Sequence, residues 1–136
     1  MCAHMPITHA FYKKYKVVVV SWEGVITDQD LVPSYSAAYA SPNWQPGLSE
    51  ISDLRNADMS VVTIEGLRDL SNKVEPFYKG VSHNTAVVSP EDLSYGFSRF
   101  YEMMRIESVE NLRAFRELAS AIEWLGIDKA FLQEIS

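Results

Sequence analysis

Carboxylates and hydroxyls are the side chains of this sequence that could do chemistry together. They gather in three short connections, which run from Glu23 to Asp30, from Arg55 to Thr63 and from Ser89 to Asp92. If each connection follows a parallel strand, all three meet beside Asp53, because ligand sites in parallel sheets lie beyond the carboxyl ends of the strands. Such oxygen ligands suit a hard cation. However, each connection also precedes a helix, and Ser, Thr and Asp are preferred helix-cap residues. We therefore expect caps here and no metal.

Histidine, cysteine and glycine patterns offer little further chemistry. His4, His9 and His83 have no spacing that places two of them on one helix face, and Cys2 is the single cysteine, so we expect no zinc site. The six glycines are scattered, so the chain has no GxGxxG or GxxxxGK phosphate loop, and it has no G-x-S-x-G nucleophile elbow. These patterns predict a protein that binds no cofactor and is not an enzyme.

Aromatic and methionine residues are candidates for a second kind of site. Tyr95 and Met103 lie off the expected buried stripe of their helix, and Trp44 lies in a proline-flanked loop. Together with Asp53, these residues are candidates for a ligand pocket or an interface. The alternative is structural, because an aromatic and methionine stripe at helical spacing is usually core and a loop tryptophan usually covers the core as a lid.

The composition is that of one globular domain spanning residues 1–136. Of the 136 residues, 47% are hydrophobic and 22% are charged, which does not fit a disordered chain. The formal net charge of −6 argues against nucleic-acid binding. The longest apolar run, Val17–Val20, is far too short for a membrane helix. The start, for which Met1 and Met5 are alternatives, does not resemble a secretory signal. We therefore expect a cytoplasmic protein.

Hydrophobic periodicity predicts the element order ββαβαβαβα. A hairpin followed by strands that alternate with helices is typical of an α/β fold with a mixed five-stranded sheet, here with four main helices packed on it. The consecutive valines of Val17–Val20 indicate a strand buried on both faces. The expected strands are Ile7–Tyr12, Val17–Trp22, Leu48–Leu54, Thr85–Val88 and Asn111–Phe115, and the expected helices begin at or just after Asp30, Ile64, Ser89 and Leu118.

Local signals predict several boundaries and faces. Gly24 is expected to end its strand, Asp30 to cap the first helix, and Arg55–Ser60 to form a polar connection. In the third helix Ser89 is the expected N-cap. The expected buried stripe of that helix is Leu93, Phe97, Phe100, Tyr101 and Met104.

The tail after the expected core, residues 127–136, shows an apolar stripe. Ile127, Phe131 and Ile135 recur every four residues, with Leu132 beside them. A helix this short is marginal alone, so it should dock either on its own domain or on a second subunit of a homodimer.

Four segments make the chain similar to a known family. They are V-V-V-V-S-W-E-G-V-I-T-D-Q-D-L at Val17–Leu31, S-D-L-R-N-A-D at Ser52–Asp58, E-G-L-R-D-L at Glu65–Leu70 and N-L-R-A-F-R-E-L-A-S-A-I-E-W-L-G at Asn111–Gly126. With the element order above, the chain resembles the SpoIIAA-like (STAS-like) family, including its uncharacterised bacterial branch, over residues 7–126. Because these motifs are mostly structural, the resemblance implies a SpoIIAA-like fold more strongly than an activity.

The resemblance implies a non-enzymatic binding module that acts on a protein partner and that phosphorylation switches in some members. Those members carry a D-S-S-G-L-like stretch at the start of the second helix, whereas from Asp58 onward this chain matches it only at Gly66-Leu67. Ser60, Thr63 and Asp58 are therefore the candidate phosphorylation or interaction residues, and helix capping by Thr63 is the alternative. A related lipid-carrier fold implies a second hypothesis, a small apolar-ligand or lipid-binding protein with a pocket between sheet and helices.

Overall fold

One mixed five-stranded sheet forms the centre of the fold. In a computed structural model, which describes residues 5–136, the strands lie in the order β1-β2-β3-β4-β5. β1 pairs antiparallel with β2, and every other neighbouring pair is parallel, as the expected hairpin and crossovers require. The strands are β1 (Ile7–Tyr12), β2 (Val17–Val25), β3 (Ser49–Asp58), β4 (His83–Val88) and β5 (Glu110–Phe115).

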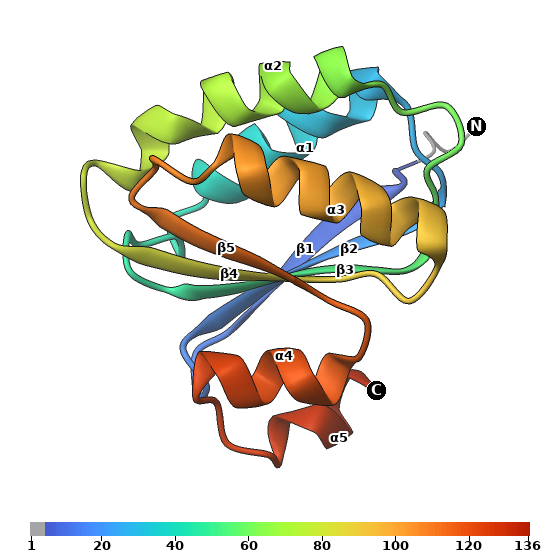
Figure 1. Cartoon of the computed structure of the whole chain (residues 1–136). Helices are drawn as coiled ribbons and strands as arrows, with labels where there is room; N and C mark the ends of the chain where they lie inside the picture. The colour runs from blue at the N-terminus through green and yellow to red at the C-terminus, as the bar shows by residue number, and fades with distance from the viewer. Residues whose placement is uncertain (1–4) are drawn as a thin grey trace.

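Helices cover both faces of the sheet. Helices α1, α2 and α3 lie on one face, which we call the three-helix side, and α4 and α5 lie on the other, the two-helix side (Figure 1). Within residues 5–136, no helix is both long enough and apolar enough to cross a membrane. The helices are α1 (Asp28–Tyr39), α2 (Ile64–Val74), α3 (Asp92–Met104), α4 (Leu118–Leu125) and α5 (Phe131–Ile135), with the 3-10 turn η1 (Glu75–Tyr78) after α2.

The valines of β2 divide the core into two parts. Val18 and Val20 face the three-helix side, whereas Val17 and Val19 face the two-helix side, and all four are at most 4% exposed. Because side chains alternate along a strand, a run of valines fills both faces of a central strand at once. The prediction of a strand buried on both faces is confirmed.

β2 and β3 are longer than the sequence indicated. Gly24 does not end β2, because it lies inside the strand with a φ of +72° and pairs with Ala57. The register with β3 shifts between Ser21 and Glu23, so a bulge and a glycine with positive φ let the strand continue. β3 correspondingly extends to Asp58, and the polar connection expected there is mostly strand.

Two helix starts differ from the prediction. Thr27, not Asp30, is the N-cap of α1, and the Asp30 carboxylate accepts hydrogen bonds from the Thr27 N–H at 2.8 Å and from its hydroxyl at 2.9 Å. Thr27 and Asp30 therefore form one capping box at the start of α1. α3 begins at Asp92 with Glu91 as its N-cap, not Ser89.

The outward face of α3 is more apolar than predicted. Leu93 and Phe100, expected in the buried stripe, are 53% and 40% exposed. Ser94 and Ser98 are buried instead, and the Ser98 hydroxyl lies 2.7 Å from the hydroxyl of Ser89. The Ser94 hydroxyl donates to the Glu91 carbonyl at 3.1 Å and the Ser98 hydroxyl to the Ser94 carbonyl at 2.8 Å, so both buried hydroxyls are satisfied. Small serines rather than Leu93 and Phe100 therefore occupy part of the buried face of α3.

The tail packs on its own domain through α5. Phe131 is 0% exposed, and its ring centroid lies 5.0 Å from that of Tyr12 and 4.8 Å from that of Tyr15. The carbonyl of Ile135 accepts a 2.7 Å hydrogen bond from Arg55 Nη2. Of the two arrangements predicted for the tail, the structure shows docking on the same chain.

Candidate functional site

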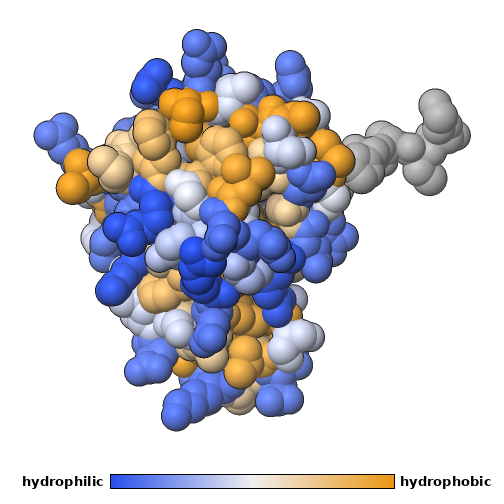
Figure 2. All heavy atoms as spheres, turned by 45° about the vertical axis from the view of Figure 1, so that its right-hand side comes forward, coloured by the Kyte–Doolittle hydropathy of each residue, from blue (hydrophilic) through white to orange (hydrophobic). Residues whose placement is uncertain are grey.

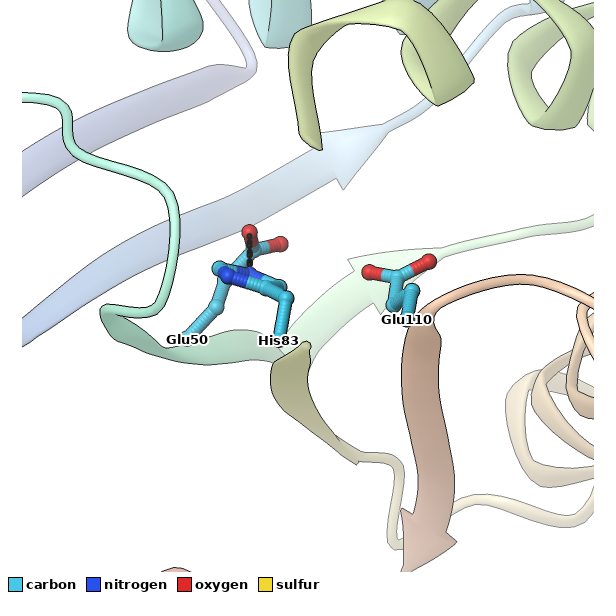
Figure 3. A group of neighbouring side chains, drawn as sticks. All are labelled: Glu50, His83 and Glu110. Carbon is cyan, nitrogen blue, oxygen red and sulfur yellow. Dashed lines mark hydrogen bonds and ion pairs between the residues drawn. The ribbon is translucent and has the colours of Figure 1, made fainter. Parts of the chain in front are cut away.

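Three ionisable side chains are buried together on the three-helix side of the sheet. Glu50, His83 and Glu110 lie at or next to the first residues of β3, β4 and β5, and they are 1%, 1% and 3% exposed. Parallel pairing aligns His83 with Glu110 and Glu50 with Thr85, which places these positions close together. Figure 3 shows the three side chains rising from neighbouring strands toward the same space. The fold thus concentrates charge inside an apolar core.

Glu50 and His83 form a buried pair. Glu50 Oε1 lies 3.2 Å from His83 Nε2 and accepts a 2.8 Å hydrogen bond from the Tyr39 hydroxyl. The other carboxylate oxygen accepts from the Ser52 hydroxyl at 3.4 Å. His83 Nδ1 has no hydrogen-bond partner among the described residues, and the ring stacks on Tyr78 with centroids 4.9 Å apart. Hydroxyl donors therefore hold the carboxylate, and aromatic packing holds the imidazole.

Glu110 is paired with a buried arginine. Arg105 Nε donates to Glu110 Oε1 at 2.8 Å, and both side chains are 3% exposed. Glu110 Oε2 accepts from the hydroxyls of Tyr78 at 2.8 Å and Thr85 at 2.6 Å. Arg105 also donates to the backbone carbonyl of Ser71 in α2 at 2.8 Å. Such pairing is needed, because an unpaired buried carboxylate would cost several kcal/mol of desolvation.

Two tyrosines join the carboxylates of Glu50 and Glu110. The hydroxyls of Tyr39 and Tyr78 lie 3.1 Å apart, and each also donates to one of the two carboxylates. Burial, followed by the charge of Glu50, raises the pKa of Tyr39, and burial with the charge of Glu110 raises the pKa of Tyr78, so both hydroxyls keep their protons. Burial and then the charge of Glu50 also raise the pKa of the Glu110 carboxyl, against the opposing effect of Arg105. The core polar network, as we call it, consists of Tyr39, Glu50, Tyr78, His83, Arg105 and Glu110.

A small cavity adjoins the core polar network. It lies between the sheet and the helices of the three-helix side, and its volume is about 40 Å³. Glu50, Ser52, Thr85 and Glu110 contribute polar groups to a wall that is otherwise mostly aromatic and aliphatic. Because one water needs roughly 10–15 Å³ on this scale, the cavity has room for a few waters. Pockets for small-molecule ligands are typically about 300–1,000 Å³, roughly an order of magnitude larger.

The core polar network contains a candidate metal-ligand set. Donor atoms of Glu50, His83 and Glu110 all lie within 4.8 Å of one another, and carboxylates with an imidazole can bind zinc and other transition metals. However, Arg105 occupies one oxygen of Glu110, and hydroxyl donors occupy the other. Glu50 Oε1 likewise accepts from Tyr39. A metal ion would have to displace these donors beside the Arg105 cation, so the geometry favours a network of paired charges.

Comparisons with known proteins bear on the fold. A scan against protein families gave no match, and a search of curated proteins gave none either. Among solved structures, the chain is similar to an uncharacterized protein of the DUF3478 family from Shewanella loihica PV-4, which has a SpoIIAA-like fold. The two chains are 15% identical with a TM-score of 0.56, over 92% of this chain and 98% of that one. The chain has a SpoIIAA-like fold. The predicted resemblance is thereby confirmed at the level of the fold.

Within the SpoIIAA-like fold, the core polar network lies at the end of the sheet opposite to the predicted site. Sequence reasoning placed candidate ligands beyond the carboxyl ends of the strands, whereas Glu50, His83 and Glu110 lie at the amino ends. At the carboxyl ends, Thr27 and Asp30 form the capping box of α1, and Asp28 meets Thr63 at the start of α2. The geometry at the carboxyl ends of the strands therefore supports helix capping rather than a cation site.

Thr63 connects the first two helices of the SpoIIAA-like fold. As the N-cap of α2, its hydroxyl accepts a 3.1 Å hydrogen bond from the Gly66 N–H, and it donates to Asp28 Oδ2 at 2.5 Å. The Thr63 N–H also donates to Asp28 Oδ1 at 2.9 Å. A Cβ at Gly66 would collide with the Asp28 carboxylate, so this close approach of α1 to α2 requires glycine. Both hydrogen-bonding roles of the Thr63 hydroxyl are therefore in use.

Ser60 and Asp58 form a separate turn just before Thr63. The Ser60 N–H donates to Asp58 Oδ1 at 2.9 Å, and hydrogen bonding by the Ser60 hydroxyl and backbone lowers the pKa of Asp58. Ser60, Asp58 and Thr63 are all exposed. Phosphorylation of Ser60 or Thr63 stays a prediction.

Trp44 and Asp53 have structural surroundings. Trp44 covers the core polar network as a lid, with its ring centroid 4.4 Å from that of Tyr39 and 5.0 Å from that of His83. Asp53, 9% exposed on the two-helix side, forms a two-point ion pair with Arg55 at 2.9 and 2.8 Å. The structural alternative stated for Trp44 is therefore the one observed, and Asp53 is tied to the arginine that holds the tail.

Tyr95 and Met103 lie at the surface of α3 in different surroundings. The half-buried Tyr95 ring carries the Arg116 guanidinium over its face, 4.3 Å from the ring centroid. Met103 is 70% exposed and lines a shallow hollow with Ile106 and Arg113. Tyr95 and Met103 thus do not converge on one site with Trp44 and Asp53. Met103 stays a candidate for an interface.

Substitutions of Thr63 test its link to Asp28. Thr63→Ala should lower the free energy of unfolding by about 1 kcal/mol, because it removes the α2 cap. Thr63→Asp should also destabilise, although Asp is a good cap residue, because its carboxylate would face that of Asp28. Urea denaturation measures both losses, and Asp28→Asn in the Thr63→Asp background should recover most of the second. Wild-type stability of Thr63→Asp would contradict this geometry.

Proposed function

We propose that this chain is a non-enzymatic, STAS-like regulatory module that acts by binding a protein partner. The observation that carries the proposal is the outward face of α3. Leu93, Phe100 and Met103 of α3 and Ile106 just after its C-cap, which together we call the α3 surface, are 53%, 40%, 70% and 83% exposed. Figure 2 shows apolar side chains gathered on the upper part of the molecule, where α1, α2 and α3 lie in Figure 1. Contiguous exposed apolar side chains rimmed by polar ones are typical of protein-interaction sites.

The polar rim of the α3 surface fits this role. Arg99 and Glu102 flank Phe100 and Met103 along the helix and form a partly exposed i,i+3 ion pair at 3.7 Å. Charged groups around an apolar centre are the usual anatomy of an interface, where the rim guides encounter and the centre provides most of the affinity. A partner that presents an apolar ridge with its own charged margin would match this surface.

The filled core favours surface binding over the alternative, a pocket for an apolar ligand or lipid. The cavity on the three-helix side measures about 40 Å³, whereas a lipid tail needs several hundred. In the core polar network, the carboxylate oxygens already accept hydrogen bonds or pair with a cation, which supports a structural rather than a catalytic role. Both observations are consistent with a module whose activity lies on its outside.

Site-specific cross-linking tests the proposal. A photo-cross-linking amino acid at position 103 should capture one defined protein in the source cells, and the same group at the exposed Glu123 position of α4 should not. With that protein purified, Met103→Glu should weaken binding about tenfold or more, because it places a charge in the apolar centre. Glu123→Lys is the matched control and should bind normally. If position 103 captures nothing beyond the control, and native mass spectrometry shows a bound apolar molecule, the ligand hypothesis replaces this one.

A further inference from the structure

The two edge strands of the sheet differ in whether side chains of the same chain pair with their outward backbone groups. β5 is an edge strand, and edge strands offer unpaired N–H and C=O groups that proteins usually block. The Ala114 N–H, which points away from β4, donates to Glu102 Oε1 at 2.9 Å. The Glu110 N–H, four residues earlier on the same edge of β5, donates to the Ser108 hydroxyl at 2.9 Å. Side chains of the same chain therefore occupy this edge.

The edge at β1 lacks such protection in the part of the chain that the structure describes. The Glu23 N–H donates to the Pro6 carbonyl at 2.7 Å, and the pairing continues in antiparallel register from Ile7 opposite Trp22. In such a ladder alternate residues pair, so the N–H and C=O groups of Ile7, His9 and Phe11 point away from β2 toward the open edge. Residues 8–10 are exposed, and Ile7–Tyr12 contains no Lys, Arg, Asp, Glu or Pro. Charged side chains and proline are the features that normally prevent an edge strand from pairing with another chain.

We propose that a second copy of this chain binds along β1. The two β1 strands run antiparallel about a two-fold axis at His9, and the two sheets become one continuous sheet. His9 then lies opposite His9 of the second copy, and Ile7 lies opposite Phe11 of that copy. Each of the three resulting pairs exchanges two backbone hydrogen bonds, so about six form in all. This interface is distinct from the α3 surface.

The edge is complementary to itself, which selects a second copy over an unrelated strand. The outward-facing residues number three, with His9 in the middle, so a two-fold axis at His9 leaves no outward group unmatched. The strand is uncharged apart from histidine, so two molecules of net charge −6 can meet there without direct repulsion.

His9→Pro tests the interface without disturbing the ladder to β2, because the His9 N–H points outward. Sedimentation velocity of the wild-type chain at about 100 μM should show a dimer, and His9→Pro should weaken dimerisation about tenfold or more. His9→Thr is the matched control: it keeps the backbone donor and a β-forming side chain, so the dimer should persist. Circular dichroism melts establish that each variant is folded.

A charge-swap pair gives a second test that does not depend on proline. His9→Lys and His9→Glu each place two like charges opposite one another, so each protein alone should be monomeric. An equimolar mixture should form a heterodimer, because the opposed charges then attract. The proposal would be overturned if the wild-type chain is monomeric at about 100 μM. It would also be overturned if the wild-type chain dimerises and His9→Pro and His9→Lys leave that dimer unchanged. A monomer that instead takes up an unrelated extended peptide along β1 would also overturn it, in favour of a heterologous partner.

Discussion

Replacing Arg105 by methionine is expected to lower the free energy of unfolding by about 3–5 kcal/mol, because Glu110 then stays buried without its cation. Arg105 Nε lies 2.8 Å from Glu110 Oε1, and the two side chains are each 3% exposed. Removing the cation raises the pKa of Glu110 further, so the stability of the variant is lost as pH rises through that raised pKa and is recovered as pH falls below it. Urea denaturation at about pH 5 and about pH 8 measures both effects.

The control for this prediction is an exposed arginine on the same stretch of chain. Arg99 is 58% exposed in its ion pair with Glu102, so Arg99→Met should change the free energy of unfolding by less than about 1 kcal/mol. The double variant Arg105→Met with Glu110→Gln removes both charges and should be more stable than Arg105→Met alone. If Arg105→Met lowers the free energy of unfolding by the same amount relative to the wild type at both pH values, lost packing rather than the uncompensated charge causes the effect.

Phe131→Ala is expected to have an effect of similar size. Phe131 is 0% exposed against the rings of Tyr12 and Tyr15, and truncating a buried phenylalanine typically costs about 3–5 kcal/mol. α5 is too short to be stable without this contact, so the helix should detach and expose part of the two-helix side. Thermal unfolding by differential scanning calorimetry measures the loss.

Two further variants separate anchoring by Phe131 from general effects of the tail. Gln133→Ala changes an exposed residue of the same helix and should melt close to the wild type. Deletion of residues 127–136 should cost at least as much as Phe131→Ala, because it also removes the hydrogen bond from Arg55 to the Ile135 carbonyl. If Phe131→Ala melts like Gln133→Ala, the tail is not anchored by this ring.

The sequence was sufficient for the order and packing of the elements, because periodicity and turn residues act locally. The valines of β2 predicted its burial correctly, and the stripe of Ile127, Phe131 and Ile135 predicted the helix of the tail. The errors arose where tertiary contacts override a local signal. Gly24 looks like a strand end, but pairing with Ala57 keeps it in the ladder. Leu93 looks like core, but it is 53% exposed, whereas Ser94 and Ser98 of the same helix are buried.

The core polar network could not be predicted in the same way. Glu50, His83 and Glu110 are distant in the chain, and only the parallel register of β3, β4 and β5 brings them together. A signal was present, because Glu50 and Ser52 alternate with Ile51 and Asp53 and so share one face of β3. Both faces of β3 are covered by helices, however, so alternation alone does not distinguish a buried polar face from a buried apolar one.

Synthesis from the amino end leaves the two-helix side of the sheet uncovered until α4 and α5 emerge. Val17, Val19, Ile51 and Val88 are covered there by α4 and α5, the final two helices. The contact from Arg55 to Ile135 joins residues 80 positions apart and so also needs α5 to have emerged. A nascent chain from which α4 and α5 have not yet emerged therefore displays a row of aliphatic side chains, as chaperone-dependent and aggregation-prone intermediates do. We expect this face to be covered only after α4 and α5 have left the ribosomal exit tunnel.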